Sequence, residues 1–534
     1  MMRLLPSRFP RFPALLTVAI GLAAVLAPTG STNPPASTSA VVGFRSQAAL
    51  ADALKRFPGA EIVRRVPHLK TVEIKLAGDA EQLASLPGIT FANRPLRRSV
   101  QAEPALTAVF RPGLPYEWQY VATRENEVPE SVLRAASALK IAVIDTGVDV
   151  THPDIAAKTP ETWDIVHHTT NVRDRDGHGT FVSSLAAGSV TNSEGVAGFS
   201  GDAQLLMIKA VGKDDMFSDV DEASAIVYAV DHGAKVVSMS IGGEGTSALE
   251  QRAVHYAASH NVLLVAAAGN EYNEGNPVEF PAAALQPPGS KGQGGVGLSV
   301  GASTMAGHRA YFSNMGSYIS LVAPGDSVFG AVAAGSNRLD WPRYPLPGSA
   351  AGLYGWSSGT SFSTPEVAGA AILVWAANPS LAAAQVAGIL KATATGRGAW
   401  NGGLGYGVID VAAAVAVASG QQIPPRIQAG AWLSMHRMRT RSVRTVRATR
   451  ALRGVRLAVH LRTSAPTVTP DYRVVSLEVR RGRHWHRIAR TTTRWGGAIR
   501  WTVGLRPGRY VLRAVYGGRW DLRSAIQLKP IRVR

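Results

Sequence analysis

Four polar residues, each beside a glycine-rich turn, carry the side chains that acyl transfer needs. They are Asp145 after the apolar run IAVI, His178 within DRDGHGTF, Asn270 at the end of VLLVAAAGN, and Ser361 within GTSFSTP. A serine hydroxyl becomes a nucleophile when an imidazole takes its proton, and a carboxylate fixes the tautomer of that imidazole. An amide donor then stabilises the developing oxyanion. The chain therefore contains every group that serine-based hydrolysis requires.

Each of the four also has a purely structural interpretation. Ser361 precedes the apolar run EVAGAAILVW, so it is either the cap of that helix or a nucleophile held at its positive end. Asp145 and Asn270 are typical of turns, and His178 is typical of a helix start. Together the four favour catalysis, because separate motifs supply the nucleophile, the base, the orienting acid and the oxyanion donor.

The elements that must position these residues alternate between strands and helices. Helical segments are predicted near residues 220–232 and 248–261. Apolar runs typical of buried parallel strands lie at residues 141–144, 205–211, 236–241, 262–268 and 297–303. This alternation predicts an α/β domain with a parallel sheet, in which reactive groups gather at the carboxyl ends of the strands.

With these motifs in this order, residues 116–419 resemble the subtilisin family of serine peptidases. The matching segments are IAVIDTGVDVTHPDI, DGHGTFVSSLAAG, SMSIGG, AAAGNE and GTSFSTPEVAGAAILV. The resemblance implies Ser361 as nucleophile and His178 as general base and then general acid. It also implies Asp145 as the residue that orients His178, and Asn270 as the oxyanion donor.

One departure lies next to the nucleophile. Many relatives have methionine and alanine where this chain has Phe362 and Ser363. Neither side chain carries the chemistry, and we expect Phe362 to pack behind the nucleophile.

The resemblance also implies where a peptide substrate binds. An extended peptide would pair as an added strand along Ser240-Ile241-Gly242-Gly243, although the glycines alone also fit a tight turn. Glu271 follows the oxyanion asparagine, and Glu279 lies where the family forms the far wall of the first specificity pocket. Two carboxylates there predict a preference for Lys or Arg before the cleaved bond, the alternative being that both glutamates are surface residues.

A structural calcium ion is implied in the same way. Asp154 in THPDI and Asn192 in the loop VTNSEGV match a calcium loop of the family, in which carboxylate, amide and backbone oxygens bind the ion. This loop is one residue longer than the tightest family version. Glu117 and Gln119 are candidates for the ligand from the amino-terminal arm, and the alternative is a polar loop without metal.

The first hundred residues predict export and self-processing. Residues 1–27 contain arginines, an apolar run too short to span a membrane and a terminal VLA, which is typical of a signal peptide. Residues 28–40 are a predicted linker. Residues 41–100 follow a β-α-β-β-α-β pattern, typical of a small α+β, ferredoxin-like domain. Its position resembles that of the family's inhibitory propeptide, and Arg97-Arg98 lies close to the expected self-cleavage.

The positive charge is concentrated at the carboxyl end. Residues 421–534 hold 26 Lys and Arg against 3 Asp and Glu, a net charge of +23. We therefore assign residues 421–534 to a separate basic domain and residues 101–420 to the peptidase domain. Short segments with period-two alternation predict an antiparallel, immunoglobulin-like β-sandwich. Such a surface attracts polyanions, and for an exported protein we expect an anionic cell-envelope polymer rather than nucleic acid. The alternative is a solvated face without a partner.

Cysteine is absent, which excludes a thiol nucleophile and a disulfide framework. We expect a secreted serine endopeptidase that works through an acyl-enzyme and cleaves its own propeptide. It would be retained at the cell surface if the basic domain binds the envelope, and no further membrane anchor is expected. The competing class is a catalytically silent protein of the same fold that binds the cell envelope through its basic domain.

Overall fold

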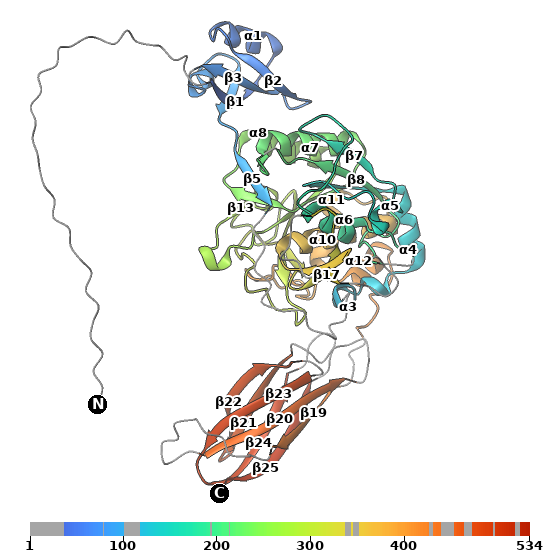
Figure 1. Ribbon diagram of the computed structural model, residues 1–534, viewed down its shortest axis with the longest axis vertical. Helices are drawn as coiled ribbons and strands as arrows, with labels where there is room; N and C mark the ends of the chain where they lie inside the picture. The colour runs from blue at the N-terminus through green and yellow to red at the C-terminus, as the bar shows by residue number, and fades with distance from the viewer. Residues whose placement is uncertain are drawn as a thin grey trace, which may run out of the picture.

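The structure is a computed structural model that describes residues 37–533 apart from 78, 101–117, 193–194, 213, 337–342, 345–351, 427–430, 439–452, 464–472, 495–496 and 518–523. Three units follow one another: a small unit (residues 37–93), an α/β unit (118–420) and a sandwich (431–533) (Figure 1). The predicted signal peptide and Glu117 lie outside the described residues.

The small unit has one antiparallel sheet with two helices. Its elements are β1 (Ser37–Phe44), α1 (Gln47–Lys55), β2 (Glu61–Val66), β3 (Thr71–Ala77), α2 (Glu81–Ala84) and β4 (Ile89–Asn93), with strand order β2-β3-β1-β4. Alternate residues Val72, Ile74 and Leu76 of β3 face a core shared with α1. β1 begins inside the segment predicted as a linker, because Ser37 already pairs with Ala77.

The α/β unit is built on a seven-stranded parallel sheet, which confirms the predicted fold class. Its strand order is β15-β14-β12-β10-β6-β8-β7. The strands are β6 (Lys140–Asp145), β7 (Glu161–Asp164), β8 (Gln204–Lys209), β10 (Val236–Met239), β12 (Leu263–Ala267), β14 (Gly297–Ser303) and β15 (Leu321–Pro324). The sequence pattern does not predict β7 and β15, because neither is a long apolar run. β7 has the sequence ETWD, and β15 is four residues long and ends in proline.

Helices cover both faces of this sheet. On one face lie α6 (His178–Ala187), α10 (Thr360–Ala377), α11 (Ala383–Thr393) and α12 (Val411–Ala418), and on the other α7 (Asp219–Asp231), α8 (Ala248–Ser259) and α9 (Ala282–Leu285). Successive residues of β6 alternate between the two cores: Ile141 and Val143 face one, Ala142 and Ile144 the other. Packing on both faces of the sheet therefore fixes the positions of the strand ends.

Shorter elements complete the α/β unit and its edge. The helical ones are α3 (Trp118–Thr123), η1 (Glu125–Glu127), α4 (Glu130–Ala135), η2 (Ala136–Ala138), α5 (Pro153–Ala156) and η3 (Tyr272–Glu274). The strands are β5 (Arg97–Val100), β9 (Phe217–Ser218), β11 (Ile241–Glu244), β13 (Glu279–Phe280), β16 (Val328–Ala331), β17 (Arg343–Tyr344) and β18 (Tyr354–Ser357). The run at residues 236–241, predicted as one strand, is divided at Ser240 between β10 and β11.

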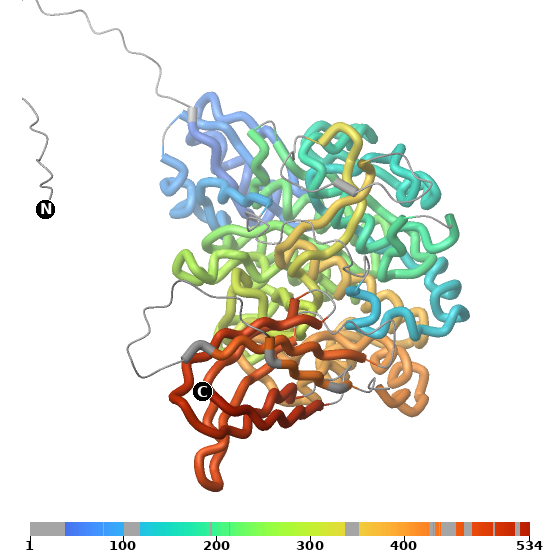
Figure 2. The backbone as a smooth tube through the Cα atoms, turned by 60° about the horizontal axis from the view of Figure 1, so that its bottom comes forward, coloured from blue at the N-terminus to red at the C-terminus, as the bar shows by residue number. Residues whose placement is uncertain are grey.

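The carboxyl-terminal unit is an antiparallel β-sandwich, as predicted. Its sheets are β19-β20-β23 and β22-β21-β24-β25, with β19 (Ala431–Arg437), β20 (Arg453–Thr463), β21 (Val474–Arg481), β22 (His484–Thr492), β23 (Ala498–Leu505), β24 (Gly508–Tyr516) and β25 (Ala525–Val533). β19 had not been predicted. The sandwich and the small unit lie at opposite ends of the α/β unit (Figures 1 and 2). Within the described part of the chain, every helix is too short or too polar to cross a membrane.

Candidate active site

The candidate base and its orienting acid are in direct contact. Nδ1 of His178 lies 2.8 Å from Oδ1 of Asp145, and both side chains are fully buried. Asp145 is the last residue of β6, and the backbone N–H of Thr146 donates to the same carboxylate oxygen at 2.8 Å. A carboxylate that accepts from Nδ1–H leaves the other ring nitrogen, Nε2, as the proton acceptor.

Two glycines allow His178 to come this close to the end of β6. Gly177 caps α6 with a φ of 102°, a left-handed conformation that favours glycine. At Gly179 a Cβ atom would lie 2.1 Å from the carbonyl oxygen of Gly147. Any larger side chain at these positions would push the first turn of α6 away from Asp145.

A second buried carboxylate, absent from the sequence prediction, holds the loop behind His178. Asp174 accepts from the Thr146 hydroxyl at 3.0 Å, from the Gly177 N–H at 2.8 Å, and from the N–H and hydroxyl of Thr180 at 2.8 and 2.6 Å. Burial raises the pKa of Asp174 despite these donors. Asp174 thus connects the loop after β6 to α6; its place in the DRDGHG motif was its only signal in the sequence.

Ser361 is the second residue of α10, so the alternative that it is the cap of this helix is wrong. Gly359 is the cap of the helix and α10 begins at Thr360, so Ser361 does not cap it. The helix starts six residues before the apolar run because the TSFSTP segment is itself buried and helical, with Pro365 inside its first turns. The Ser361 hydroxyl is buried and makes no hydrogen bond to a described residue.

The surroundings of Ser361 are fixed by packing and by one backbone contact. The Ser240 hydroxyl donates to the Ser361 carbonyl oxygen at 2.7 Å. Phe362 is fully buried, with ring centroids 5.8 Å from His178 and 4.5 Å from Phe181, so it packs behind the nucleophile and the base as expected.

Asn270 is tied to the start of α10 through its side-chain carbonyl. Its Oδ1 accepts from the Thr360 N–H at 2.9 Å and from the Thr360 hydroxyl at 3.0 Å. A Cβ atom added at Gly359 would lie 3.4 Å from Asn270 Nδ2. The amide donor therefore lies beside the residues that lead into Ser361, where an oxyanion donor is needed.

The predicted substrate-binding segment already pairs with a strand. β5 lies between β11 and β9, antiparallel to both, with Val100 opposite Ile241 and Ser99 opposite Gly242. The strand runs toward Ser240, which contacts Ser361. An extended segment of this chain thus occupies the edge where β-strand addition of a substrate was expected.

The small unit that precedes β5 packs on α7 and α8. Arg64 forms an ion pair with Asp221 of α7. Arg252 of α8 donates to the Leu69 carbonyl at 2.9 Å and lies over the Phe91 ring, 4.7 Å from its centroid. Figure 1 shows the small unit above these two helices, with β5 descending from it.

Glu271 and Glu279 lie together beside Asn270. A Cβ atom at Gly269 would lie 2.8 Å from Glu271 Oε2 and 2.7 Å from Glu279 Cγ. Glu271 Oε2 accepts from the Asn270 N–H at 2.7 Å and from Asn314 Nδ2 at 3.1 Å. Burial, followed by repulsion from Glu271, raises the pKa of Glu279 to about 7.

The carboxylate of Asp154, predicted as a calcium ligand, accepts hydrogen bonds from neighbouring protein groups. The buried carboxylate accepts from Asn192 Nδ2 at 2.7 Å and from the Val196 N–H at 2.9 Å. Gln119 directs its Nε2 to the Phe329 carbonyl, which leaves a single buried amide oxygen, Oε1, without a described partner. Calcium requires six to eight oxygen ligands, whereas hydrogen-bond donors surround this carboxylate. The described residues contain no cluster of three or more His, Cys, Asp or Glu suited to a metal.

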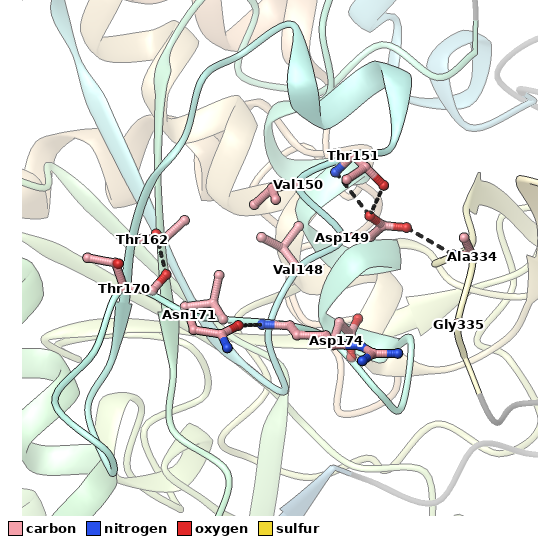
Figure 3. A pocket seen from close by; sticks show the side chains of 12 residues that line it. Val148, Asp149, Val150, Thr151, Thr162, Thr170, Asn171, Asp174, Ala334 and Gly335 are labelled. Carbon is pink, nitrogen blue, oxygen red and sulfur yellow. Dashed lines mark hydrogen bonds between the residues drawn. The ribbon is translucent and has the colours of Figure 1, made fainter.

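A separate pocket of about 420 Å³ opens beside the Asp174 loop (Figure 3). Its wall includes Asp149, whose carboxylate accepts from the Thr151 hydroxyl at 2.6 Å and from the Ala334 N–H at 3.0 Å. Asp149 and Asp174 are its acidic lining residues, and both are engaged with neighbouring backbone groups. The pocket therefore adds no catalytic group to the site.

Comparisons with known proteins identify the family to which this site is similar. The model of the subtilase family matches residues 136–407. Thermitase of Thermoactinomyces vulgaris is 34% identical over 239 residues, which cover 45% of this chain and 75% of thermitase. A thermophilic serine proteinase of Bacillus sp. strain AK1 is 31% identical over 285 residues, 53% of this chain and 64% of that protein.

Among solved structures, fervidolysin from Fervidobacterium pennivorans, described as a keratinolytic enzyme related to subtilisin, superposes with a TM-score of 0.59 at 20% identity. The match covers 94% of this chain and 77% of fervidolysin. At this identity the likeness concerns the fold alone.

Proposed function

The chain belongs to the subtilase family of serine peptidases, and we propose that it is made as a secreted precursor that removes its own amino-terminal unit. As a member of this family it is a serine endopeptidase. The observation that carries the more specific proposal is the position of β5, which pairs with β11 and runs toward Ser240 and Ser361. The competing class, a silent binding protein, is not favoured by the family match.

We assign the chemical steps to the four residues predicted from the sequence. His178 Nε2 takes the proton of Ser361 Oγ as that oxygen attacks the peptide carbonyl, and the C=O electrons move to the oxyanion. Asn270 Nδ2 stabilises that charge. The protonated imidazole, stabilised by Asp145, then gives its proton to the leaving amine as the C–N bond breaks. Water repeats the sequence on the acyl-enzyme and releases the acid.

The small unit is proposed as an inhibitory propeptide. Its contacts with α7 and α8 hold β5 at the substrate edge, so a second peptide cannot pair with β11 while β5 is in place. Cleavage after β5 would free this edge. Reaction of the purified protein with a serine-directed fluorophosphonate before and after maturation tests this: labelling of Ser361 should rise on maturation, and equal labelling would contradict inhibition.

The predicted preference for Lys or Arg immediately before the cleaved bond remains a proposal. It is supported by the two neighbouring carboxylates Glu271 and Glu279 beside Asn270. Against it, Glu271 already accepts two hydrogen bonds from the protein and Glu279 has a raised pKa. Cleavage rates for a peptide series that varies only this residue decide between a basic and an apolar preference.

We infer that the loop around Asn192 is held by hydrogen bonds rather than by calcium. Calcium binding is common in the family, and that is the reason to expect it here. The two donors on Asp154, Asn192 Nδ2 and the Val196 N–H, favour the metal-free alternative. No catalytic step depends on this choice.

The basic sandwich is proposed to retain the secreted enzyme at an anionic cell-envelope polymer. The support is its charge: residues 421–534 carry a net charge of +23. Binding of the full chain to envelope preparations should weaken steeply when the salt concentration is raised about tenfold, from roughly 50 to roughly 500 mM. Binding that does not change with salt would contradict the proposal, and stronger binding to nucleic acid would reassign the partner.

A further inference from the structure

One arginine of β5 is enclosed by acidic residues. Arg98 is among the largest fully buried side chains of the protein, with no exposed surface. Its guanidinium forms ion pairs with Glu250 of α8 and with Glu222 of α7, the latter at 3.4 Å, and both carboxylates are themselves fully buried. Asp219, at the start of α7, adds a third buried carboxylate to this acidic pocket.

Backbone carbonyls beside the acidic pocket also accept hydrogen bonds from the guanidinium. Arg98 also donates to the Gly245 carbonyl at 2.9 Å and to the Glu244 carbonyl at 3.4 Å. A Cβ atom at Gly243 would lie 3.0 Å from the Arg97 carbonyl oxygen and 3.4 Å from Arg98 Cδ, so the glycine leaves room for the side chain to enter. Planar donors in a fixed fork suit such a set of acceptors better than an ammonium group.

The neighbouring arginine shows that this arrangement is specific to one position. Arg97 points the other way, as successive residues of a strand do, and pairs with Asp214 at 2.9 Å. Both side chains of that pair are more than half exposed. Arg97 therefore serves as a built-in comparison for a basic residue that lacks the acidic pocket.

Loss of β5 would leave the acidic pocket without its cation. Burial, followed by repulsion from Glu250, already raises the pKa of Glu222 to about 8 with Arg98 in place. Removal of one partner of a buried ion pair is strongly unfavourable, because the other charge stays buried and uncompensated. After maturation the three carboxylates therefore need either protons or a new cation.

We propose that the acidic pocket of Asp219, Glu222 and Glu250 is a specificity subsite that selects an arginine side chain of peptide substrates, with Arg98 as its occupant in the uncleaved chain. This rests on the proposed function, in which β5 takes the position of a substrate strand. It is distinct from the pair Glu271 and Glu279, which flanks Gly269. The enzyme then prefers substrates with an arginine upstream of the cleaved bond. In its own sequence Arg98 holds this position, two residues before Val100.

The test uses the mature enzyme and internally quenched peptides with the chain's own sequence RPLRRSVQAEPAL, residues 94–106. Arg98 is replaced by citrulline, which keeps the shape without the charge, by lysine and by alanine; the matched control is alanine at Arg97. Citrulline or alanine at Arg98 should lower kcat/KM at least about 30-fold, with lysine between. Alanine at Arg97 should change it less than about 3-fold.

Glu250→Gln tests the same subsite from the enzyme side. This variant should reduce the preference for arginine over citrulline at the Arg98 position, whereas Asp214→Asn, which alters the partner of Arg97, should retain it. If Glu250→Gln does not accumulate as folded protein, the peptide series on the unaltered enzyme still decides the question.

Two outcomes overturn the proposal. Equal cleavage of the arginine and citrulline peptides shows that the acidic pocket does not select, and equal losses at Arg97 and Arg98 show a general attraction between charges. Failure of the proposed function has a different signature: no peptide of the series is cleaved, and Ser361 does not react with the fluorophosphonate.

Discussion

The imidazole of His178 and the carboxylate of Asp145 meet at 2.8 Å in a site closed to solvent. Because Thr146 N–H shares the same carboxylate oxygen, Asp145 is held in one orientation even without the histidine. The pair is thus pre-organised: the carboxylate accepts from Nδ1, and Nε2 is left to act on Ser361.

Asp145→Asn should lower kcat about 10⁴-fold with little change in stability, because the asparagine amide donates to Nδ1 and imposes the wrong tautomer. Steady-state kinetics on a peptide substrate measure this loss. Asp149→Asn, in the same loop but outside the triad, is the control and should retain most of the activity. A loss of less than tenfold in Asp145→Asn would remove Asp145 from the catalytic group.

Asn270→Ala should lower kcat about 100- to 1,000-fold and leave KM nearly unchanged, because the amide acts on the oxyanion and not on the bound substrate. The control is Asn276→Ala, which alters a side chain that bonds to the backbone of Met315 in a neighbouring loop. If KM rises instead while kcat is kept, Asn270 binds substrate rather than the transition state.

The preference for a basic residue before the cleaved bond should depend on pH. Because the pKa of Glu279 is raised to about 7, its carboxyl is mostly neutral at pH 6 and mostly ionised at pH 8. The ratio of kcat/KM for Lys and Leu peptides should therefore increase from pH 6 to pH 8, and Glu279→Gln should flatten it. The ratio cancels any titration common to both substrates, and a flat ratio in the unaltered enzyme would contradict a role for Glu279.

Chelation should leave the thermal stability unchanged, whereas loss of the Asn192 amide should lower it. Asn192→Ala removes a donor to the buried carboxylate of Asp154 and should cost about 1–3 kcal/mol of unfolding free energy. Asn273→Ala alters an exposed asparagine and is the control. Calorimetry in the Ser361→Ala background avoids autolysis. A fall in Tm on addition of EDTA that calcium reverses would contradict the metal-free alternative and support a calcium site.

The parallel sheet could be predicted, and four candidate catalytic positions could be proposed, because each signal is local. Strand runs such as IAVI and VLLVAAA are continuous and apolar, and Asp145, His178, Asn270 and Ser361 each stand in a short glycine-containing motif. The exact start of a helix depends on tertiary packing, which a local motif does not determine. The start of α10 at Thr360 illustrates this, since burial extends the helix through TSFSTP.

The acidic pocket and the donors on Asp154 lay beyond sequence reasoning for a different reason. Glu222 and Glu250 are in the first turns of α7 and α8, where acidic residues are common as partners of the helix dipole, so neither stands out. The pair Arg97-Arg98 is predicted only to lie close to the self-cleavage site, whereas the partners of Arg98 come from α7 and α8. The Val196 N–H reaches Asp154 from 42 residues away, and no local pattern reveals such a contact.

The most direct test of the central claim is the mass of the secreted protein and its amino-terminal residue in three forms. The unaltered chain and Ser363→Ala should both lose the small unit and begin after Val100, because Ser363 only donates to the carbonyls of Ala323 and Pro324. Ser361→Ala should retain the small unit. If Ser361→Ala begins at the same residue as the unaltered chain, the protein does not process itself through Ser361, and the account is contradicted.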